Sequence, residues 1–347
     1  MKNLPLNPQT EINGYLFYTL PYSILYTFPE YRDYLMEHYL QCFGYIDERN
    51  YMIYGYADGI GYHGDMFCDT GPLDIVFHSY ALGLQLDIKK YIISAIDNNN
   101  YVIIFADEYY LETRPAYEKE HRLHEIIIFG YDDERFNYFV FDRKPFFASF
   151  PQSQIDDAYR FGYDMYMNTP IEARVNWVND KSIVLMKAKP VQSPYIFSVN
   201  RFIENLQSYL KGEFSASYNS FVFPQKRAYI GVYNTNLVRY CAEKMYPVDA
   251  VYILYPSIHA WYESKANLLT KIKYCYEKSN IENSGLISAY EREVKKQSDV
   301  VRMLFFKYGQ NGKLNRDAAA SLLDNIFASE SNIVGSIHDE LKGKCSE

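Results

Sequence analysis

The chain has 347 residues, enough to bury a large hydrophobic core and to form two domains. Its 43 acidic and 35 basic residues give a formal net charge of −8, and no stripe of lysine and arginine is visible, so we expect no nucleic-acid partner. Prolines and polar residues stand where a signal peptide needs an apolar core, and no run of about 18 apolar residues occurs. We therefore expect a cytoplasmic protein without a membrane-spanning helix.

The cysteines indicate a reducing environment. Their number is odd, they are widely scattered and no two of them form a CxxC pair, so neither a disulfide framework nor a structural zinc site is predicted. The five are Cys42, Cys68, Cys241, Cys275 and Cys345.

Residues 15–43 are predicted to form an entry strand followed by a helix, because apolar residues such as Ile24 and Leu25 recur at spacings of three and four. Pro21 fits a first helical turn, and Pro29 divides the pattern into a short helix and a longer one. The next segment, residues 51–74, holds too many glycines for a long helix. It is predicted to be a loop that forms one wall of a cleft.

A helix over residues 88–96 leads into the most informative stretch of the chain, residues 101–142. This stretch contains three strand-like runs with turn residues between them, and the last two are predicted to form an antiparallel hairpin. The runs are 102–105, 126–129 and 138–141. His124 opens the second run and Asp142 closes the third, so the hairpin is expected to make them neighbours. A histidine held by a carboxylate is an oriented general base.

The segment 187–194 contains two prolines and separates this strand-rich part from a helical part. Beyond it, apolar residues recur with helical spacing in four stretches. The stretches are 202–210, 258–276, 286–308 and 322–341. We predict an α+β protein with one domain at residues 1–190, built on an antiparallel sheet, and a helical domain at residues 191–347.

The stretch before and within the hairpin resembles a known family. It carries an acidic and aromatic motif, a tyrosine, a histidine before an isoleucine run, and a closing aspartate. These are Asp107-Glu108-Tyr109-Tyr110-Leu111, Tyr117, His124-Glu125-Ile126-Ile127-Ile128-Phe129-Gly130-Tyr131-Asp132 and Asp142. The pattern is similar to the papain-like family typified by the N-terminal domain of butirosin biosynthesis protein H, related in fold to C39-type cysteine peptidases.

This resemblance implies an acyltransferase or amide-forming enzyme of natural-product biosynthesis, closthioamide-type pathways included. Such an enzyme would take an acyl or peptidyl group from a carrier-protein thioester and pass it to an amine. Its partners would be the carrier protein and the amine substrate, and no cofactor is implied. His124 would be the base and Asp142 would orient it.

The nucleophile is where the chain departs from the family, because no cysteine lies near the start of the first helix. A thiol there would have its pKa lowered by the helix dipole. Ser23 lies nearest that place, one turn after Thr19, and it could be a nucleophile or only an N-cap or first-turn residue. Cys68, in the glycine-rich loop, could reach the cleft, whereas Cys42 is expected at the wrong end of the helix.

No metal or nucleotide site is predicted. His121 and His124 would share a face only on a helix, and no third ligand stands at a suitable spacing. The acidic residues 132–134 fit a solvated turn better than a calcium loop, and no phosphate-binding glycine motif occurs.

Two further alternatives stay open. The chain could be a catalytically inactive papain-like binding or scaffold protein of a nonribosomal peptide-type pathway, as the missing cysteine suggests. It could also catalyse direct aminolysis, in which an activated thioester needs only the histidine base.

Overall fold

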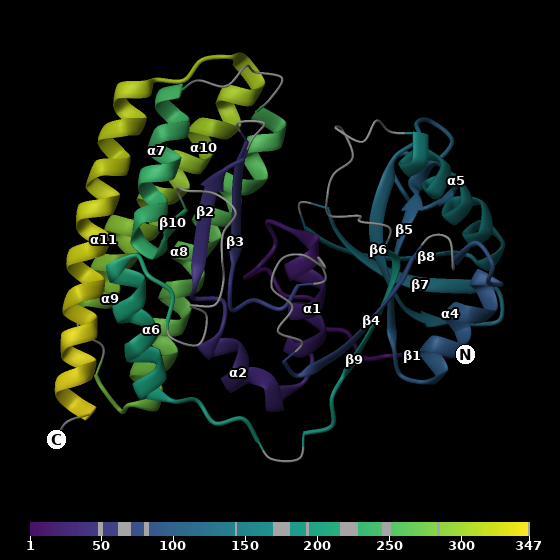
Figure 1. Ribbon diagram of the computed structural model, residues 1–347, viewed down its shortest axis with the longest axis horizontal. Helices are drawn as coiled ribbons and strands as arrows, with labels where there is room; N and C mark the ends of the chain where they lie inside the picture. The colour runs from purple at the N-terminus through teal and green to yellow at the C-terminus, as the bar shows by residue number, and fades with distance from the viewer. Residues whose placement is uncertain are drawn as a thin grey trace. The chain divides into compact units, whose positions relative to one another are not determined.

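The computed structural model describes most of the chain, and its contacts divide into two compact units (Figure 1). Unit 1 comprises Met1–Thr10, Leu16–Tyr31 and Ile60–Pro194, and unit 2 comprises Glu11–Tyr15, Arg32–Gly59 and Tyr195–Glu347. The described residues are 1–47, 51–61, 71–79, 83–142, 144–168, 181–191, 194–215, 228–244, 251–282 and 285–345.

Unit 1 is built on an antiparallel sheet with the strand order β4-β9-β5-β6-β7-β8. The short strand β1 pairs with the C-terminal end of β6. The strands are β1 (Lys2–Asn3), β4 (Leu73–Ser79), β5 (Tyr101–Asp107), β6 (Leu123–Tyr131), β7 (Arg135–Asp142), β8 (Lys144–Pro151) and β9 (Lys181–Ala188). Every residue of β5 is buried, which explains why its first six residues, 101–106, form an unbroken apolar run before Asp107.

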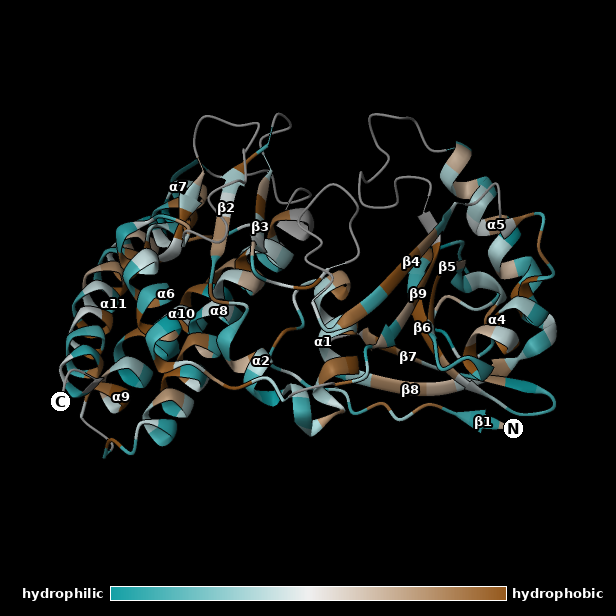
Figure 2. Ribbon diagram, turned by 60° about the horizontal axis from the view of Figure 1, so that its bottom comes forward, coloured by the Kyte–Doolittle hydropathy of each residue, from teal (hydrophilic) through white to brown (hydrophobic). Residues whose placement is uncertain are grey.

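Helices cover both faces of this sheet (Figure 1). α4 (Ile88–Asp97) and α5 (Ile155–Asn168) pack on β5 and β6, and α1 (Leu16–Tyr26) packs on β7 and β9 from the opposite side. Gly162 lets α5 approach closely, because a Cβ there would lie 3.0 Å from Leu123 Cδ1. The strands that lie between the helices are mostly hydrophobic along their length (Figure 2).

The predicted hairpin is confirmed. β6 and β7 pair antiparallel, with Ile127 opposite Phe139 and Ile128 opposite Tyr138. On the other side of β6, His124 pairs with Ala106 of β5. The start of β6 therefore meets the end of β5, which places His124 beside the residues that follow that strand.

Unit 2 combines helices with a small antiparallel sheet of order β10-β2-β3. Its strands are β2 (Cys42–Ile46), β3 (Met52–Tyr56) and β10 (Tyr229–Ile230). Its main helices are α2 (Arg32–Glu37), α6 (Val199–Lys211), α7 (Asn234–Lys244), α8 (Val251–Lys278), α9 (Gly285–Tyr290), α10 (Lys296–Asn311) and α11 (Arg316–Cys345). A π-helical turn, Glu291–Lys295, joins α9 to α10.

The predicted class, an α+β protein with an antiparallel sheet and a mainly helical C-terminal region, is confirmed. The expected loop over residues 51–74 is wrong in part, because Met52–Tyr56 forms β3 with Tyr54 and Tyr56 buried. The predicted domain division near residue 190 assigned residues 32–59 to the first domain, whereas their contacts are with unit 2. No helix among the described residues is long and apolar enough to cross a membrane.

A buried carboxyl group in unit 2 holds the segment that precedes α1. Glu263 on α8 is 3% exposed and accepts hydrogen bonds from the backbone N–H groups of Asn13 and Gly14. A Cβ on residue 14 would lie 2.6 Å from Glu263 Oε2, so this contact requires glycine. Burial raises the pKa of Glu263 to about 8, although the two N–H groups lower it.

This shift predicts a pH-dependent stability. The unfolded chain ionises Glu263 near its ordinary pKa of 4.5, and the folded chain only near 8. The stability from the neutral folded group is complete below pH 4.5 and is lost as the pH rises to about 8. The slope is about 1.4 kcal/mol per pH unit. In urea unfolding at several pH values, Glu263→Gln should lose this part of the slope, and an unchanged slope would contradict the assignment.

Candidate active site

Two consecutive carboxylates mark the end of β5. Asp107 closes the strand and Glu108 begins a 3₁₀ turn, and both residues are fully buried. Buried carboxylates need partners, because an isolated charge in a protein interior is strongly unfavourable. The loop between β5 and β6, and the first residues of β6, supply them.

Glu108 contacts a guanidinium group and an imidazole ring. Its Oε1 accepts a hydrogen bond of 2.7 Å from Arg114 Nε and lies 3.0 Å from His124 Nδ1. Arg114 is 3% exposed, and its guanidinium carbon lies 5.7 Å from the centre of the Phe146 ring. Burial raises the pKa of Glu108, but the contact with His124, its charge and Arg114 outweigh burial and hold that pKa below its usual value.

The Glu108 contact leaves the other nitrogen of His124 available. His124 Nδ1 lies within ion-pair distance of Glu108 Oε1 but makes no hydrogen bond of good geometry among the described residues. A proton on Nδ1 would face this carboxylate and would leave the lone pair on Nε2. His124 makes no polar contact through Nε2 within the described part of the chain, and 17% of its side chain is exposed. The arrangement can therefore accept a proton at Nε2 while the carboxylate stabilises the imidazolium.

Sequence reasoning expected Asp142, not Glu108, at His124 Nδ1. Asp142 ends β7, where its backbone pairs with Lys144 across the turn to β8. Continuing the β6–β7 register from Ile127 and Phe139 by three residues pairs position 124 with position 142. The side chain of Asp142 lies outside the described residues, so its contact with His124 stays a prediction. Glu108 was overlooked because an acidic residue after a strand also fits a solvated turn.

Ser23 is not at the start of a helix. α1 begins at Leu16, and Ser23 is its eighth residue of 11. It is fully buried, and its Oγ has no hydrogen-bond partner among the described residues. The expectation placed Pro21 in the first turn, but the helix starts five residues earlier and contains this proline. The first turn, residues 16–19, holds neither cysteine nor serine.

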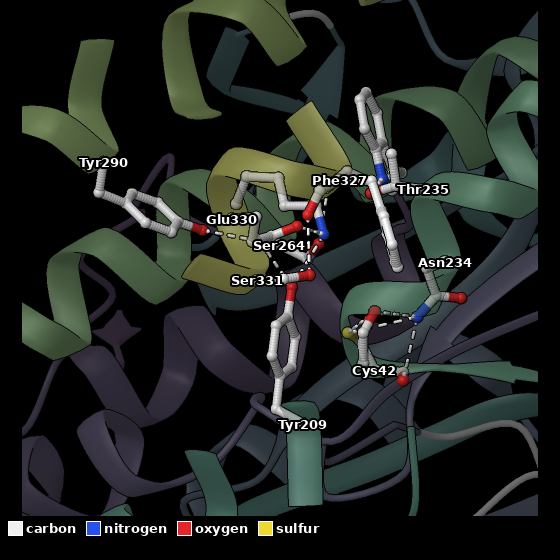
Figure 3. Close-up of polar contacts among 12 residues, drawn as sticks. Cys42, Tyr209, Asn234, Thr235, Ser264, Tyr290, Phe327, Glu330 and Ser331 are labelled. Carbon is white, nitrogen blue, oxygen red and sulfur yellow. Dashed lines mark hydrogen bonds and ion pairs between the residues drawn. The ribbon is translucent and has the colours of Figure 1, made fainter. Parts of the chain in front are cut away.

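The cysteines lie elsewhere. Cys68 lies outside the described residues. Cys42 does not end a helix: it opens β2 in unit 2, where it is 1% exposed. Burial raises the pKa of its thiol, although Lys265 lowers it. Asn234 Nδ2 lies 3.5 Å from its sulfur (Figure 3). A buried thiol with a raised pKa is a poor nucleophile.

A buried ion pair lies in the same core, and Figure 3 labels its carboxylate partner, Glu330. Lys265 Nζ on α8 lies 2.9 Å from Glu330 Oε2 on α11, and both side chains are fully buried. Tyr209 donates a hydrogen bond of 2.8 Å to Glu330 Oε1, and Tyr290 donates another of 3.1 Å. The single carboxylate of Glu330 thus joins α6, α8, α9 and α11.

Removing this carboxylate charge should destabilise unit 2. Glu330→Gln leaves Lys265 buried without a counter-charge, which typically costs about 3–5 kcal/mol. Adding Lys265→Met should restore part of the loss, because no buried charge then remains. Urea unfolding measures both effects. The exposed pair Arg239–Asp324 also reaches α11, so Asp324→Asn is the control and should cost less than about 1 kcal/mol. Equal costs for both single variants would refute this account.

A second histidine contacts the other carboxylate. His121 Nδ1 lies 2.6 Å from Asp107 Oδ2. His121 and His124 therefore bind different carboxylates, Asp107 and Glu108. The described residues contain no group of three or more His, Cys, Asp or Glu side chains arranged to hold a metal ion.

A comparison with protein families matches this region. Residues 73–143 match the family described as butirosin biosynthesis protein H, N-terminal. The match confirms the predicted resemblance to this family over these residues. The match covers about a fifth of the chain, runs from the start of β4 to just after β7, and includes both carboxylate–histidine pairs of this butirosin-type segment. No curated protein matches the chain.

The carboxylate that orients His124 can be identified by NMR of its ring. Glu108→Gln removes the negative charge at Nδ1, so the His124 ring signals should shift strongly. Asp142→Asn should shift them less, because the contact seen here is with Glu108. The reverse order would make Asp142 the orienting carboxylate.

Proposed function

We propose that this protein catalyses acyl transfer to an amine in natural-product biosynthesis, with His124 as the general base and Glu108 as the residue that positions it. The contact between His124 Nδ1 and the buried carboxylate of Glu108 carries the proposal. The family match supports it, because that family is described as a biosynthesis protein. The donor is an acyl or peptidyl thioester on a carrier protein.

The reaction proposed is direct aminolysis. His124 Nε2 removes a proton as the amine nitrogen attacks the thioester carbonyl carbon, so that a C–N bond forms. The C–S bond then breaks, and the imidazolium returns the proton to the departing thiolate. Glu108 stabilises the imidazolium formed between these steps. This route needs no side-chain nucleophile, which agrees with a first turn of α1 that lacks cysteine and serine.

A binding or scaffold protein is the second candidate. The observation that favours it is the burial of possible nucleophiles in the described chain: Ser23, Cys42, Cys241 and Cys275. Such a protein would bind the carrier protein or the thioester without converting it, and His124 would then serve only to neutralise Glu108.

Substitution of His124 separates these two functions. His124→Ala should lower the rate of amide formation from a carrier-bound thioester by about 10²-fold or more, the scale of general-base catalysis. Binding of the carrier protein should change little, because one small part of the surface is lost. His338→Ala, whose Nδ1 contacts the neighbouring Asp339, controls for the loss of a histidine. A folded His124→Ala variant that forms amide at the wild-type rate would rule out the enzyme.

A further inference from the structure

The second carboxylate–histidine pair has a shorter contact, 2.6 Å, than the first, 3.0 Å. Asp107 is fully buried, and its Oδ2 accepts a hydrogen bond of 2.6 Å from His121 Nδ1. Its Oδ1 accepts backbone N–H groups of Tyr109 at 3.1 Å and Arg122 at 2.9 Å. Because both oxygens are engaged, the carboxylate cannot turn away from the imidazole.

The His121 ring is held without being buried. It stacks on Tyr109 with a centroid distance of 4.4 Å and an interplanar angle of 24°. Tyr110 lies at 6.1 Å from the same ring and stacks in turn on Phe161 of α5. The His121 side chain is 51% exposed, and within the described part of the chain Nε2 makes no polar contact. A fixed ring with an open Nε2 is prepared to react.

Other described histidines have different contacts. His78 contacts Tyr91, and His259 contacts Asn13. His338 contacts Asp339, a carboxylate that is 83% exposed. His121 and His124 each contact a fully buried carboxylate, and the side chain of His121 is three times as exposed as that of His124.

We propose that His121, oriented by Asp107, is a second reactive imidazole that accepts acyl groups from activated esters and thioesters. This goes beyond the base role proposed for His124, and it would give the protein the exposed nucleophile that α1 does not supply. Histidine forms covalent acyl intermediates, and an adjacent carboxylate that holds the Nδ1 proton increases the electron density at Nε2.

Acyl transfer through His121 takes two stages, acylation of the ring and then release of the acyl group. Nε2 of neutral His121 attacks the carbonyl carbon, an N–C bond forms, and the bond from that carbon to oxygen or sulfur breaks. The leaving group departs as an alkoxide or thiolate. The Nδ1 proton of the acyl-imidazolium passes to Asp107 or solvent, which leaves a neutral acyl-imidazole. An amine or water then attacks the acyl carbon, the N–C bond breaks, and the ring takes back a proton.

Diethyl pyrocarbonate tests this reactivity in the intact protein, because it acylates neutral imidazole and the modified peptides can be mapped by mass spectrometry. His121 should react at least about tenfold faster than the small model compound Nα-acetylhistidine amide under the same conditions. This factor is smaller than the roughly 10²–10⁴-fold rate increase that general acid–base catalysis supplies. Exposure alone cannot produce a rate above that of the free amide. Hydroxylamine should reverse the modification.

Substitutions test whether the fast acylation depends on the contact between His121 and Asp107. Asp107→Asn should lower the rate at His121 by about tenfold, again less than the full effect of a general base. His121→Gln should remove the labelled peptide, and His338→Gln should leave labelling at residue 121 unchanged. Asp107 also accepts hydrogen bonds from two backbone N–H groups, so Asp107→Asn can fail to fold. In that case the reaction rate of His121 in the wild type, compared with that of Nα-acetylhistidine amide, tests the proposal.

A true acyl donor completes the test. After reaction with p-nitrophenyl acetate and an acid quench, the wild type and His124→Ala should both carry a hydroxylamine-sensitive acetyl group on His121, and His121→Gln should not. Loss of amide formation in His124→Ala alongside an intact His121 adduct would show that the two roles are separate. If His121 reacts no faster than the free amide, the proposal for His121 is overturned, and the aminolysis proposed for His124 is unaffected.

Discussion

The structure around the candidate site depends on the burial of two adjacent carboxylates at the end of β5. Asp107 and Glu108 are both fully buried, and each must find hydrogen-bond donors or positive charge in the interior. The loop that follows returns to satisfy them: Arg114 reaches Glu108, and the backbone N–H of Arg122 reaches Asp107. The same requirement orients both histidines. The geometry of the two possible reactive nitrogens is therefore a consequence of how the strand ends.

Unit 2 also contains buried charged side chains, but they form a structural network rather than a candidate active site. Lys265 and Glu330 are paired inside the helices, with tyrosine hydroxyl groups completing the hydrogen bonds of the carboxylate. Neither side chain reaches solvent, so this network can position helices but cannot receive a substrate. In unit 1, by contrast, the buried carboxylates are linked to rings that remain partly exposed. This difference in exposure, rather than the presence of buried charge, separates a candidate active site from a structural network.

The sequence predicted the strands of the hairpin and the helices α4, α6, α8, α10 and α11, because apolar periodicity reports which side of an element is buried. It did not predict α5 or α7, and the entry strand expected from residue 15 is wrong, because α1 begins at Leu16. It placed His124 correctly at the start of β6. It missed the partner Glu108, because the path of the loop over residues 111–122 depends on tertiary contacts that spacing does not encode. The sequence feature that points to Glu108 is the pair of acidic residues that directly follows the apolar run 101–106, because both of them are buried together with the strand. Ser23 lies inside α1 rather than near its start, because the helix contains Pro21 instead of beginning at it.

The lack of cysteine and serine in the first turn of α1 limits the acyl donors that the candidate site can use. An amide or simple ester has a poor leaving group, and a site without a metal ion or a carboxylate dyad commonly cleaves it through a covalent intermediate that divides the step in two. A thioester already carries a good leaving group, and a positioned base together with an oriented amine lowers the remaining barrier. General-base catalysis contributes roughly 10²–10⁴-fold and orientation adds more, so the two together suit an activated donor. A site with His124 and Glu108 but no thiol is thus better matched to thioester aminolysis than to peptide hydrolysis.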